Sequence, residues 1–294
     1  MKNVLITGAG SYVGTHVEEW LVKEPQSFHV DTVETMNDAW RQADFSKYDV
    51  IFHVAGIAHV DPNPEMAPLY YKVNRDLAIE VAKEAKTKGV RQFIYMSSKI
   101  VYHASKSLKG DAVTPQTEPQ PNDFYGDSKL QAEKGLRALE SDTFKVAIIR
   151  PPMIYGANSK GNFQRLGWLA TKTPVFPAWH NKRSMLYIDN LSEFVKNLIV
   201  RDLGGIFYPQ NKELADTVEI VRYFAYKYHK KIWISRVLNP LVWLGAFLLK
   251  PLPKMFADSY YVPEMSVYDF DYQLVSFEDS LKRIEIVESN KRLR

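Results

Sequence analysis

The chain has 294 residues, a formal net charge of +4 and no cysteine, and 46% of its residues are hydrophobic. This composition is typical of a globular protein with enough apolar side chains for a sizeable core, and it excludes a disordered chain. The lack of cysteine excludes a disulfide scaffold, a thiolate zinc site and cysteine catalysis. The small, dispersed charge argues against a protein that binds nucleic acid.

The hydrophobic segments indicate where in the cell the protein is expected. No uninterrupted stretch of about 18 apolar residues occurs, so we expect no integral membrane segment. The apolar run at 4–6 is too short for a signal peptide, which favours a cytoplasmic protein. Residues 241–249, LVWLGAFLL, form the most apolar segment of the chain. We expect a helix there that is buried or faces a partner, with a helix on a membrane surface as the alternative.

The first 150 residues alternate short apolar runs with longer helical patterns. Strands are predicted at 4–6, 28–33, 50–54, 92–96 and 144–149, and helices at 13–24, 73–88 and 125–139. This alternation predicts an α/β fold with a doubly wound parallel sheet of the Rossmann type. The polar stretch 105–123 is predicted to be a long loop.

In the second half of the chain, strand and helix patterns no longer alternate regularly. Residues 151–294 are richer in proline and aromatic residues. Only a helix at 190–201 and a strand at 206–208 are clear. We expect a smaller α/β part there, packed on the sheet, with some segments returning to it.

A glycine-containing turn, TGAGSYVG at 7–14, follows the first predicted strand and opens the first helix. Glycine lets the backbone approach a pyrophosphate closely, and the free amides at a helix N-terminus attract its charge. The context of strand, turn and helix therefore predicts a dinucleotide site. Its residues in this turn are expected to be Gly8, Gly10, Ser11, Tyr12, Val13 and Gly14.

An acidic residue is expected at the end of the second strand, about 20 residues after the turn. Glu34 lies 20 residues beyond Gly14, and Asp31 lies 17 beyond it. We favour Glu34, because the strand is predicted to run through Val33. A carboxylate there accepts hydrogen bonds from ribose hydroxyls and repels a 2′-phosphate, so NAD is favoured and NADP remains open.

A tyrosine and a lysine, Tyr125 and Lys129, lie four residues apart and therefore share one face of a predicted helix. A nearby cation favours the phenolate, and lowering the tyrosine pKa by ~3 units corresponds to about 4 kcal/mol. Tyr125 is then suited to move a proton to and from an alcohol. Ser97 and Ser98 follow the fourth strand, at the sheet edge where such folds place their sites, and a hydroxyl there is suited to hold the reacting oxygen.

Several segments occur together in a characteristic order. They are TGAGSYVG at 7–14, DVIFHVAG at 49–56, YKVN at 71–74, YMSSKIVY at 95–102, YGDSK at 125–129, IIRPPMIYG at 148–156, NKRSMLYIDNL at 181–191 and VSFEDSLKR at 275–283. With this set the chain resembles the extended short-chain dehydrogenase/reductase family, in its NAD-dependent nucleotide-sugar epimerase/dehydratase branch. The resemblance covers nearly the full chain.

The resemblance implies roles for individual residues. Ser98 looks like the catalytic hydroxyl, Tyr125 like the acid/base, and Lys129 like its partner, which also touches the nicotinamide ribose. Arg183 looks like the arginine that binds the substrate's diphosphate. Asn74 matches an asparagine that supports the active-site backbone. Further positions expected near the cofactor are Asp44, Phe45, Val54, Ala55, Gly56, Asn74 and Pro152.

The departures from the family pattern bear on the reaction. Ser11 stands in place of the middle glycine, and His103 stands where glycine is usual. A 4,6-dehydratase has Asp-Glu after its catalytic hydroxyl, whereas this chain has Lys99-Ile100. Neither of these two residues can supply the acid and base that dehydration needs, which argues against a dehydratase.

The family implies hydride transfer at C4 of a nucleoside-diphosphate sugar, with residues 1–150 binding NAD(P) and 151–294 mainly the substrate. A UDP-sugar 4-epimerase is slightly favoured over a reductase of 4-keto-6-deoxy nucleotide sugars. Two weaker alternatives are a reductase of a non-nucleotide ketone and a non-catalytic dinucleotide-binding protein. The family often forms homodimers through the helix that carries Tyr125. No metal site is expected, because His53, His59 and His103 lack metal-binding spacing.

Overall fold

A computed structural model describes residues 1–36, 38–58, 63–102, 107–159, 161–248 and 251–286. Its centre is a six-stranded sheet in the order β10-β6-β4-β3-β1-β2, and every neighbouring pair is parallel. The strands are β1 (Lys2–Thr7), β2 (Phe28–Val33), β3 (Val50–His53), β4 (Gln92–Met96), β6 (Lys145–Ile149) and β10 (Gly205–Phe207). The predicted parallel sheet is therefore confirmed.

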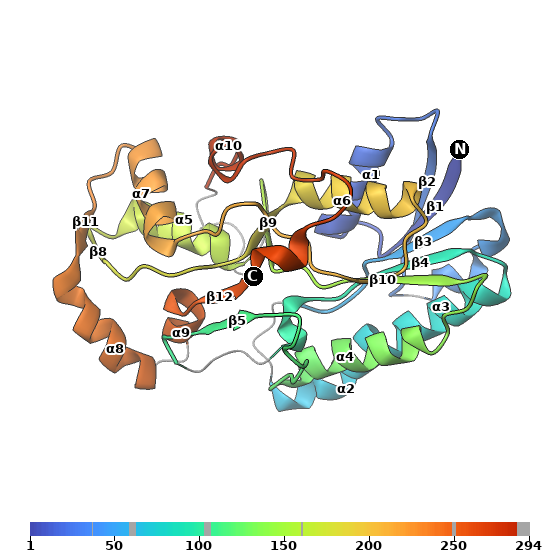
Figure 1. Cartoon of the computed structure of the whole chain (residues 1–294), viewed down its shortest axis with the longest axis horizontal. Coiled ribbons are helices and arrows are strands. Elements are labelled where there is room, and N and C mark those ends of the chain that lie inside the picture. The colour runs from blue at the N-terminus through green and yellow to red at the C-terminus, as the bar shows by residue number, and fades with distance from the viewer. Residues whose placement is uncertain (37, 59–62, 103–106, 160, 249–250, 287–294) are drawn as a thin grey trace.

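Helices cover both faces of this sheet (Figure 1). On one face lie α1 (Tyr12–Leu21) and α6 (Ile188–Val200), and on the other lie α3 (Leu77–Thr87) and α4 (Phe124–Arg137). Alternate strand residues face opposite helical layers, as the pleat of a strand requires. Val4 and Ile6 belong to the core under α1 and α6, whereas Leu5 packs on the side of α3 and α4.

The helix expected from Val73 begins earlier and is not uniform. It consists of α2 (Ala67–Tyr70), a π-helical stretch (Tyr71–Asp76) and α3, in direct succession. A π-helical turn is rare and is frequent at functional sites. Here it surrounds Asn74, whose buried side chain is described below. The apolar spacing from Val73 onward does not reveal the wider turn before it.

The second part contains helices and short strand pairs. Its helices are α5 (Asn162–Lys172), α7 (Thr217–Lys227), α8 (Asn239–Leu248), α9 (Pro251–Phe256) and α10 (Phe277–Lys282). Three parallel pairs join β5 (Asp111–Val113) to β12 (Ser259–Tyr261), β7 (Met153–Tyr155) to β9 (Met185–Tyr187), and β8 (Val175–Pro177) to β11 (Trp233–Ser235). Single 3₁₀ turns span Ala39–Gln42, Phe45–Lys47, Pro64–Met66, Lys99–Val101, Arg236–Leu238 and Pro263–Ser266.

Two expectations for these segments need correction. The stretch 105–123 is not only a loop, because β5 lies within it and pairs with β12, far along the chain. The helix at 241–249 is present as α8, but it is not buried, because most of its apolar side chains are exposed. What covers those side chains is taken up below.

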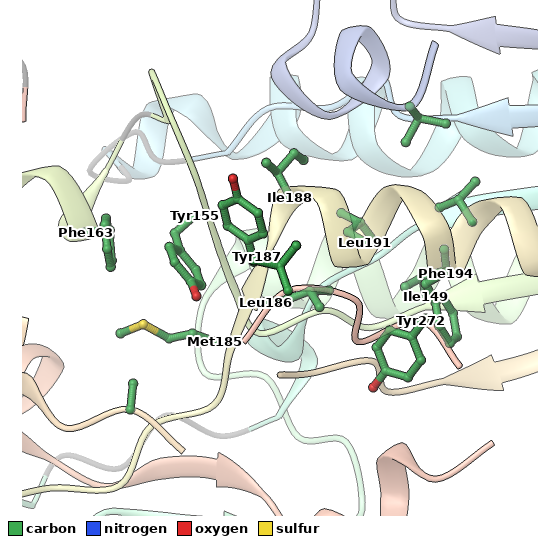
Figure 2. Packing of buried hydrophobic residues seen from close by; sticks show 14 of the residues in the cluster. Ile149, Tyr155, Phe163, Met185, Leu186, Tyr187, Ile188, Leu191, Phe194 and Tyr272 are labelled. Atoms are coloured by element: carbon green, nitrogen blue, oxygen red, sulfur yellow. The ribbon is translucent and has the colours of Figure 1, made fainter. Parts of the chain in front are cut away.

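One continuous core joins the two parts. Figure 2 shows Tyr155 beside Tyr187, with Phe163 on the far side of Tyr155 and with Leu191 of α6 farther along the same cluster, which also includes Ile149 of β6. The rings of Tyr155 and Phe163 lie 4.6 Å apart, and the Tyr155 hydroxyl accepts a hydrogen bond from Asn211 at 2.8 Å. The second part is thereby fixed at the carboxyl edge of the sheet.

Candidate active site

The glycine turn between β1 and α1 brings two strand ends close together. Gly8 has φ +108° and Gly10 has φ +71°, a region that favours glycine. A Cβ at Gly8 would lie 2.8 Å from the Ala55 nitrogen, and one at Gly14 would lie 3.1 Å from Val54. The absence of side chains at Gly8 and Gly14 thus lets the turn lie directly against Val54 and Ala55, while the space beside Gly10 stays open, and we call this turn the glycine cradle. This cradle fits a dinucleotide.

The N-terminus of α1 supplies the polar part of this cradle. Ser11 caps the helix, and its hydroxyl accepts a hydrogen bond from the Gly14 amide at 3.2 Å. The preceding helical amides, of Tyr12 and Val13, lie at the positive end of the helix dipole, where a phosphate is favoured. Ser11 therefore replaces the family glycine as a helix cap, and the amides of Tyr12 and Val13 stay at the helix end.

The end of β2 adjoins the same turn. The Gly8 and Ala9 amides both donate to the Val33 carbonyl, at 2.9 and 3.2 Å, so Glu34 follows directly beside the cradle. The Glu34 carboxylate accepts hydrogen bonds from the Thr35 and Met36 amides. These bonds hold the carboxylate at the strand end, where the ribose of a dinucleotide is expected.

The expectation for Asp44 and Phe45 needs refinement. Phe45 is completely buried in the core under α3, so its side chain cannot face a ligand. Asp44 is exposed and caps a 3₁₀ turn by accepting from the Ser46 amide. Any contact of Phe45 with adenine is therefore limited to its backbone.

Three predicted catalytic side chains lie together at the carboxyl end of β4. The Tyr125 hydroxyl, on the first turn of α4, is hydrogen-bonded to the Ser98 side chain. Lys129 is buried one helical turn later, and its Nζ donates to the Met96 carbonyl at 2.8 Å. A Cβ at Gly56 would lie 3.2 Å from this Nζ. The structure thus places the cradle, the phenol and the ammonium around one site.

The pKa values of this pair differ from the prediction. Burial raises the pKa of Tyr125 to about 12, although the hydrogen bond with Ser98 acts in the opposite direction. Burial also lowers the pKa of Lys129 to about 8. The expectation that Lys129 lowers the Tyr125 pKa is therefore wrong for the protein's own groups. The physical reason is that desolvation penalises both charged forms, and the Lys129 ammonium is directed at a carbonyl.

Asn74 links this site to the chain after β3. Its Oδ1 accepts from the Ile57 amide at 2.8 Å, and its Nδ2 donates to the Ile57 carbonyl and to Ser128, both at 3.2 Å. The Asn74 carbonyl in turn accepts from the buried Tyr95 hydroxyl at 2.8 Å. The side chain thereby fixes the backbone next to Gly56 against the helix that carries Tyr125.

A buried ion pair behind the site was not predicted. Arg150 donates to both carboxylate oxygens of Glu133, with a shortest distance of 2.6 Å, and both side chains are almost fully buried. The Ser97 hydroxyl donates to the same carboxylate, and Arg150 also donates to the Tyr102 hydroxyl. Glu133 lies four residues after Lys129 on the same helical face, which is the signal that could have identified it.

On the other side of Ser98, two cations approach each other. Lys99 donates from Nζ to the Ser259 hydroxyl at 2.8 Å, and Ser259 lies beside Arg183 in a β-bridge. Arg183 donates from Nη1 to the Lys254 and Met255 carbonyls of α9. Burial, and secondarily repulsion by Arg183, lowers the pKa of Lys99 to about 8. Burial also lowers the pKa of Arg183. Such a pair is suited to an anion, and Lys99 was not predicted to take part.

Other predicted residues fall around these groups. Pro152 is buried just after β6, and the neighbouring Pro151 carbonyl accepts from the Lys99 amide at 2.9 Å. His53 is buried, contacts Thr7 and has a pKa lowered by burial to about 3, so it is neutral. His59 and His103 lie outside the described residues. Within the described ranges, no cluster of three or more His, Asp or Glu side chains is arranged to hold a metal.

Comparison with known proteins decides the family. The sequence model of the NAD-dependent epimerase/dehydratase family matches residues 4–196. The chain belongs to this family. UDP-glucose 4-epimerase of Vibrio cholerae is 31% identical over 255 residues, which cover 79% of this chain and 77% of that protein. N-acetyl-α-D-glucosaminyl-diphospho-ditrans,octacis-undecaprenol 4-epimerase of Escherichia coli O157:H7 is 27% identical over 285 residues, covering 91% of this chain and 85% of that protein.

A solved structure of similar fold is the UDP-glucuronic acid 4-epimerase of Bacillus cereus in complex with NAD. The TM-score is 0.73 at 18% identity, and the match covers 96% of this chain and 97% of that one. The protein is thus an NAD(P)-dependent enzyme of a family that epimerises, dehydrates or reduces nucleotide sugars. Among the described residues, no helix is long and apolar enough to cross a membrane.

Proposed function

We propose that the protein is a 4-epimerase of a nucleoside-diphosphate sugar. The proposal rests on one observation: the Tyr125–Ser98 hydrogen bond lies between two parts of the candidate site that have different chemistry. On one side is the glycine cradle with Lys129, which suits a dinucleotide. On the other side are Lys99 and Arg183, which suit an anionic substrate. An acid–base group between a cofactor site and a cation pair fits a reaction on a sugar diphosphate.

The proton chemistry is assigned to Tyr125 and Ser98. A bound oxidised nicotinamide would supply a reversible hydride acceptor for C4 and a positive charge that favours the phenolate. Tyr125 takes the proton of the C4 hydroxyl as hydride leaves C4. After the 4-keto sugar has turned its opposite face to the cofactor site, hydride returns to that face of C4 and Tyr125 returns the proton to the ketone oxygen, which inverts C4. Ser98 donates a hydrogen bond that orients the reacting oxygen. The cycle consumes no net cofactor.

The substrate side holds the diphosphate. Arg183 keeps one guanidinium nitrogen on the α9 carbonyls, which fixes its side chain in place. Lys99 brings a second positive charge close to Ser98. A bound diphosphate would stabilise both cations, since each is disfavoured by burial. Because Lys99 and Ile100 replace an acid and a base, the same positions disfavour dehydration.

The experiment is to purify the protein and supply UDP-sugars. A 4-epimerase retains NAD through purification, gives the C4 epimer and leaves NADH absorbance unchanged. The alternative, a 4-keto-6-deoxy nucleotide-sugar reductase, instead depletes NADH when a 4-keto sugar nucleotide is added. Failure of both assays would overturn the nucleotide-sugar assignment. If Arg183→Ala leaves KM unchanged, a substrate without a diphosphate becomes the better assignment.

A second substrate is favoured by a specific feature. The Escherichia coli relative is named for a sugar diphosphate attached to undecaprenol. In this chain, Arg183 contacts α9, and α9 packs against the exposed apolar helix α8. A diphosphate bound by Arg183 thus has an apolar surface nearby for a lipid chain. Parallel assays with UDP-N-acetylglucosamine and polyprenyl-diphospho-N-acetylglucosamine decide between the two carriers.

A further inference from the structure

Helix α8 exposes a broad apolar face. Leu241 is 63% exposed, Leu244 56% and Leu248 78%, whereas Val242 is only 6% exposed. At about 100° per residue, the exposed positions, together with Trp243, span an arc of roughly 160° centred opposite Val242. The helix therefore rests on the protein through the side of Val242 and presents leucines outward. A helix facing water normally carries polar residues on that face.

This face continues along the neighbouring segment. Val237, in the 3₁₀ turn before α8, and Trp233, on β11, are also exposed. We call these side chains the apolar edge: Trp233, Val237, Leu241, Trp243, Leu244 and Leu248. Figure 1 shows β11 and α8 in orange at the end of the molecule far from the six-stranded sheet. An apolar group of this kind on a protein surface marks an interaction site.

The segment that carries the apolar edge has charges of one sign only. Residues 220–257 contain seven of the chain's 38 Lys and Arg residues and none of its 34 Asp and Glu residues. Lys230, Lys231 and Arg236 precede α8 and are exposed, and Lys254 in α9 is exposed as well. The basic side chains thus flank the apolar helix in sequence on both sides. This arrangement complements a surface that has an apolar interior and anionic groups above it.

We propose that the apolar edge docks the protein on an anionic phospholipid bilayer, with α8 lying in the interface. The outward face of α8 has no charged residue to pair with a polar rim, which a protein partner normally offers. Acyl chains cover such a face without requiring hydrogen bonds, and lysine and arginine beside it bind lipid phosphates. At ten residues, α8 is about 15 Å long, which suits a helix on the surface rather than across it.

Docking has a consequence for the candidate active site. Gly245 of α8 packs so closely on α9 that a Cβ there would lie 2.7 Å from Leu252. The Lys254 and Met255 carbonyls of α9 hold Arg183. The bilayer would therefore lie next to the element that positions the proposed diphosphate-binding arginine. This link rests on the proposed function, whereas membrane docking itself does not.

The test is flotation of the full chain with vesicles of phosphatidylglycerol and phosphatidylcholine, compared with phosphatidylcholine alone. We expect the protein to float with the anionic vesicles. Leu244→Gln/Leu248→Gln should lower the bound fraction by more than about tenfold, since two leucines leave the acyl region. The matched control is Val200→Gln, because Val200 is also 56% exposed but lies on α6. This control should float like the unmodified protein.

Several results would overturn the proposal. They are no flotation of the unmodified protein, equal flotation of the leucine variant, or a leucine-dependent self-association without vesicles in a protein that does not float. Quenching of Trp243 by brominated lipids, compared with Trp243→Phe, tests the same contact without relying on the leucine variant. Turnover of a UDP-sugar without vesicles reports separately on the proposed function, and the leucine variant should retain it.

Discussion

Two lysines on opposite sides of Ser98 have the same lowered pKa of about 8, but they are held in different ways. Lys129 lies on α4 and donates to the carbonyl of Met96, at the end of a strand beneath it. Lys99 follows Ser98 directly and donates to Ser259, which lies 160 residues further along the chain. The cofactor side thus depends on a local helix motif, and the substrate side depends on a distant strand pair.

The charges of Lys129 and Lys99 therefore differ in how much they depend on a bound ligand. Lys129 is almost completely buried, so its position hardly depends on a ligand. Lys99 shares its surroundings with Arg183, and the two repel each other. Two cations that repel each other are stabilised by an anion that binds to both. The protein itself therefore fixes the proposed cofactor side, whereas the proposed substrate side would gain electrostatic stability from a bound diphosphate.

The largest effect is expected at the group between the two sides. Tyr125→Phe removes the hydroxyl that is hydrogen-bonded to Ser98, and turnover should fall by about 10²–10⁴-fold, because the proposed mechanism assigns the proton transfer to this phenol. Binding of NAD should be retained, as measured by fluorescence titration. Tyr71→Phe is the control, because its hydroxyl bonds Asp127 elsewhere on the same helix. Near-normal turnover of Tyr125→Phe would remove Tyr125 from its proposed role.

The next largest effect is expected for the buried ion pair between Glu133 and Arg150. Glu133→Gln leaves the Arg150 charge buried without its counter-ion, and the free energy of unfolding should fall by about 3 kcal/mol. Urea denaturation measures this change. Glu80→Gln is the matched control, because Glu80 also meets an arginine at 2.6 Å but on the surface. The control should lose less than about 1 kcal/mol. Equal losses in the two variants would contradict a buried origin.

The sheet could be predicted because its elements have strong local patterns. The strands from Phe28 and from Gln92 have the predicted bounds, since short apolar runs alternate there with long helical stretches. The pairing of β5 with β12 could not be predicted in this way. Each strand has three residues, and their partners lie more than 140 residues apart. Such strands form because both ends are positioned by the rest of the fold.

The residues of the candidate site also differ in whether the sequence could predict them. Tyr125 and Lys129 follow from motif spacing and Ser98 from the family resemblance, and the structure brings them together. The position of Lys99 depends on Ser259, and no spacing in the sequence connects these two residues. The direction of the Tyr125 pKa was also beyond the sequence, because it depends on how many atoms surround the phenol. Burial is a property of the assembled fold.

A smaller effect on the cofactor side depends on pH. His53 is buried and its folded-state pKa is about 3, against an ordinary value near 6.5. Between these values only the unfolded chain binds the proton, so the stability falls as the pH decreases through this window. From pH 7 to pH 5 this contribution is about 2 kcal/mol.

Replacement of the imidazole tests this assignment. His53→Gln should flatten the pH dependence of the unfolding free energy by that amount, while the amide can still bond Thr7. An unaltered slope in the His53 variant would assign the acid sensitivity to other groups.

The smallest effect is expected from substitution of Lys99, and it distinguishes the role of Lys99 from that of Lys129. Lys99→Gln should raise KM for a nucleoside-diphosphate sugar by about tenfold and leave kcat nearly unchanged, because the charge acts on the bound anion in both ground and transition states. Lys182→Gln, beside Arg183 but exposed, should leave both constants unchanged. Since kcat/KM reports the free enzyme, its decline above pH 8 should shift to higher pH in Lys99→Arg, whose guanidinium stays charged. A decline that stays at pH 8 in this variant would assign the titration to Lys129, and the anion would then be held by Arg183 without help from Lys99.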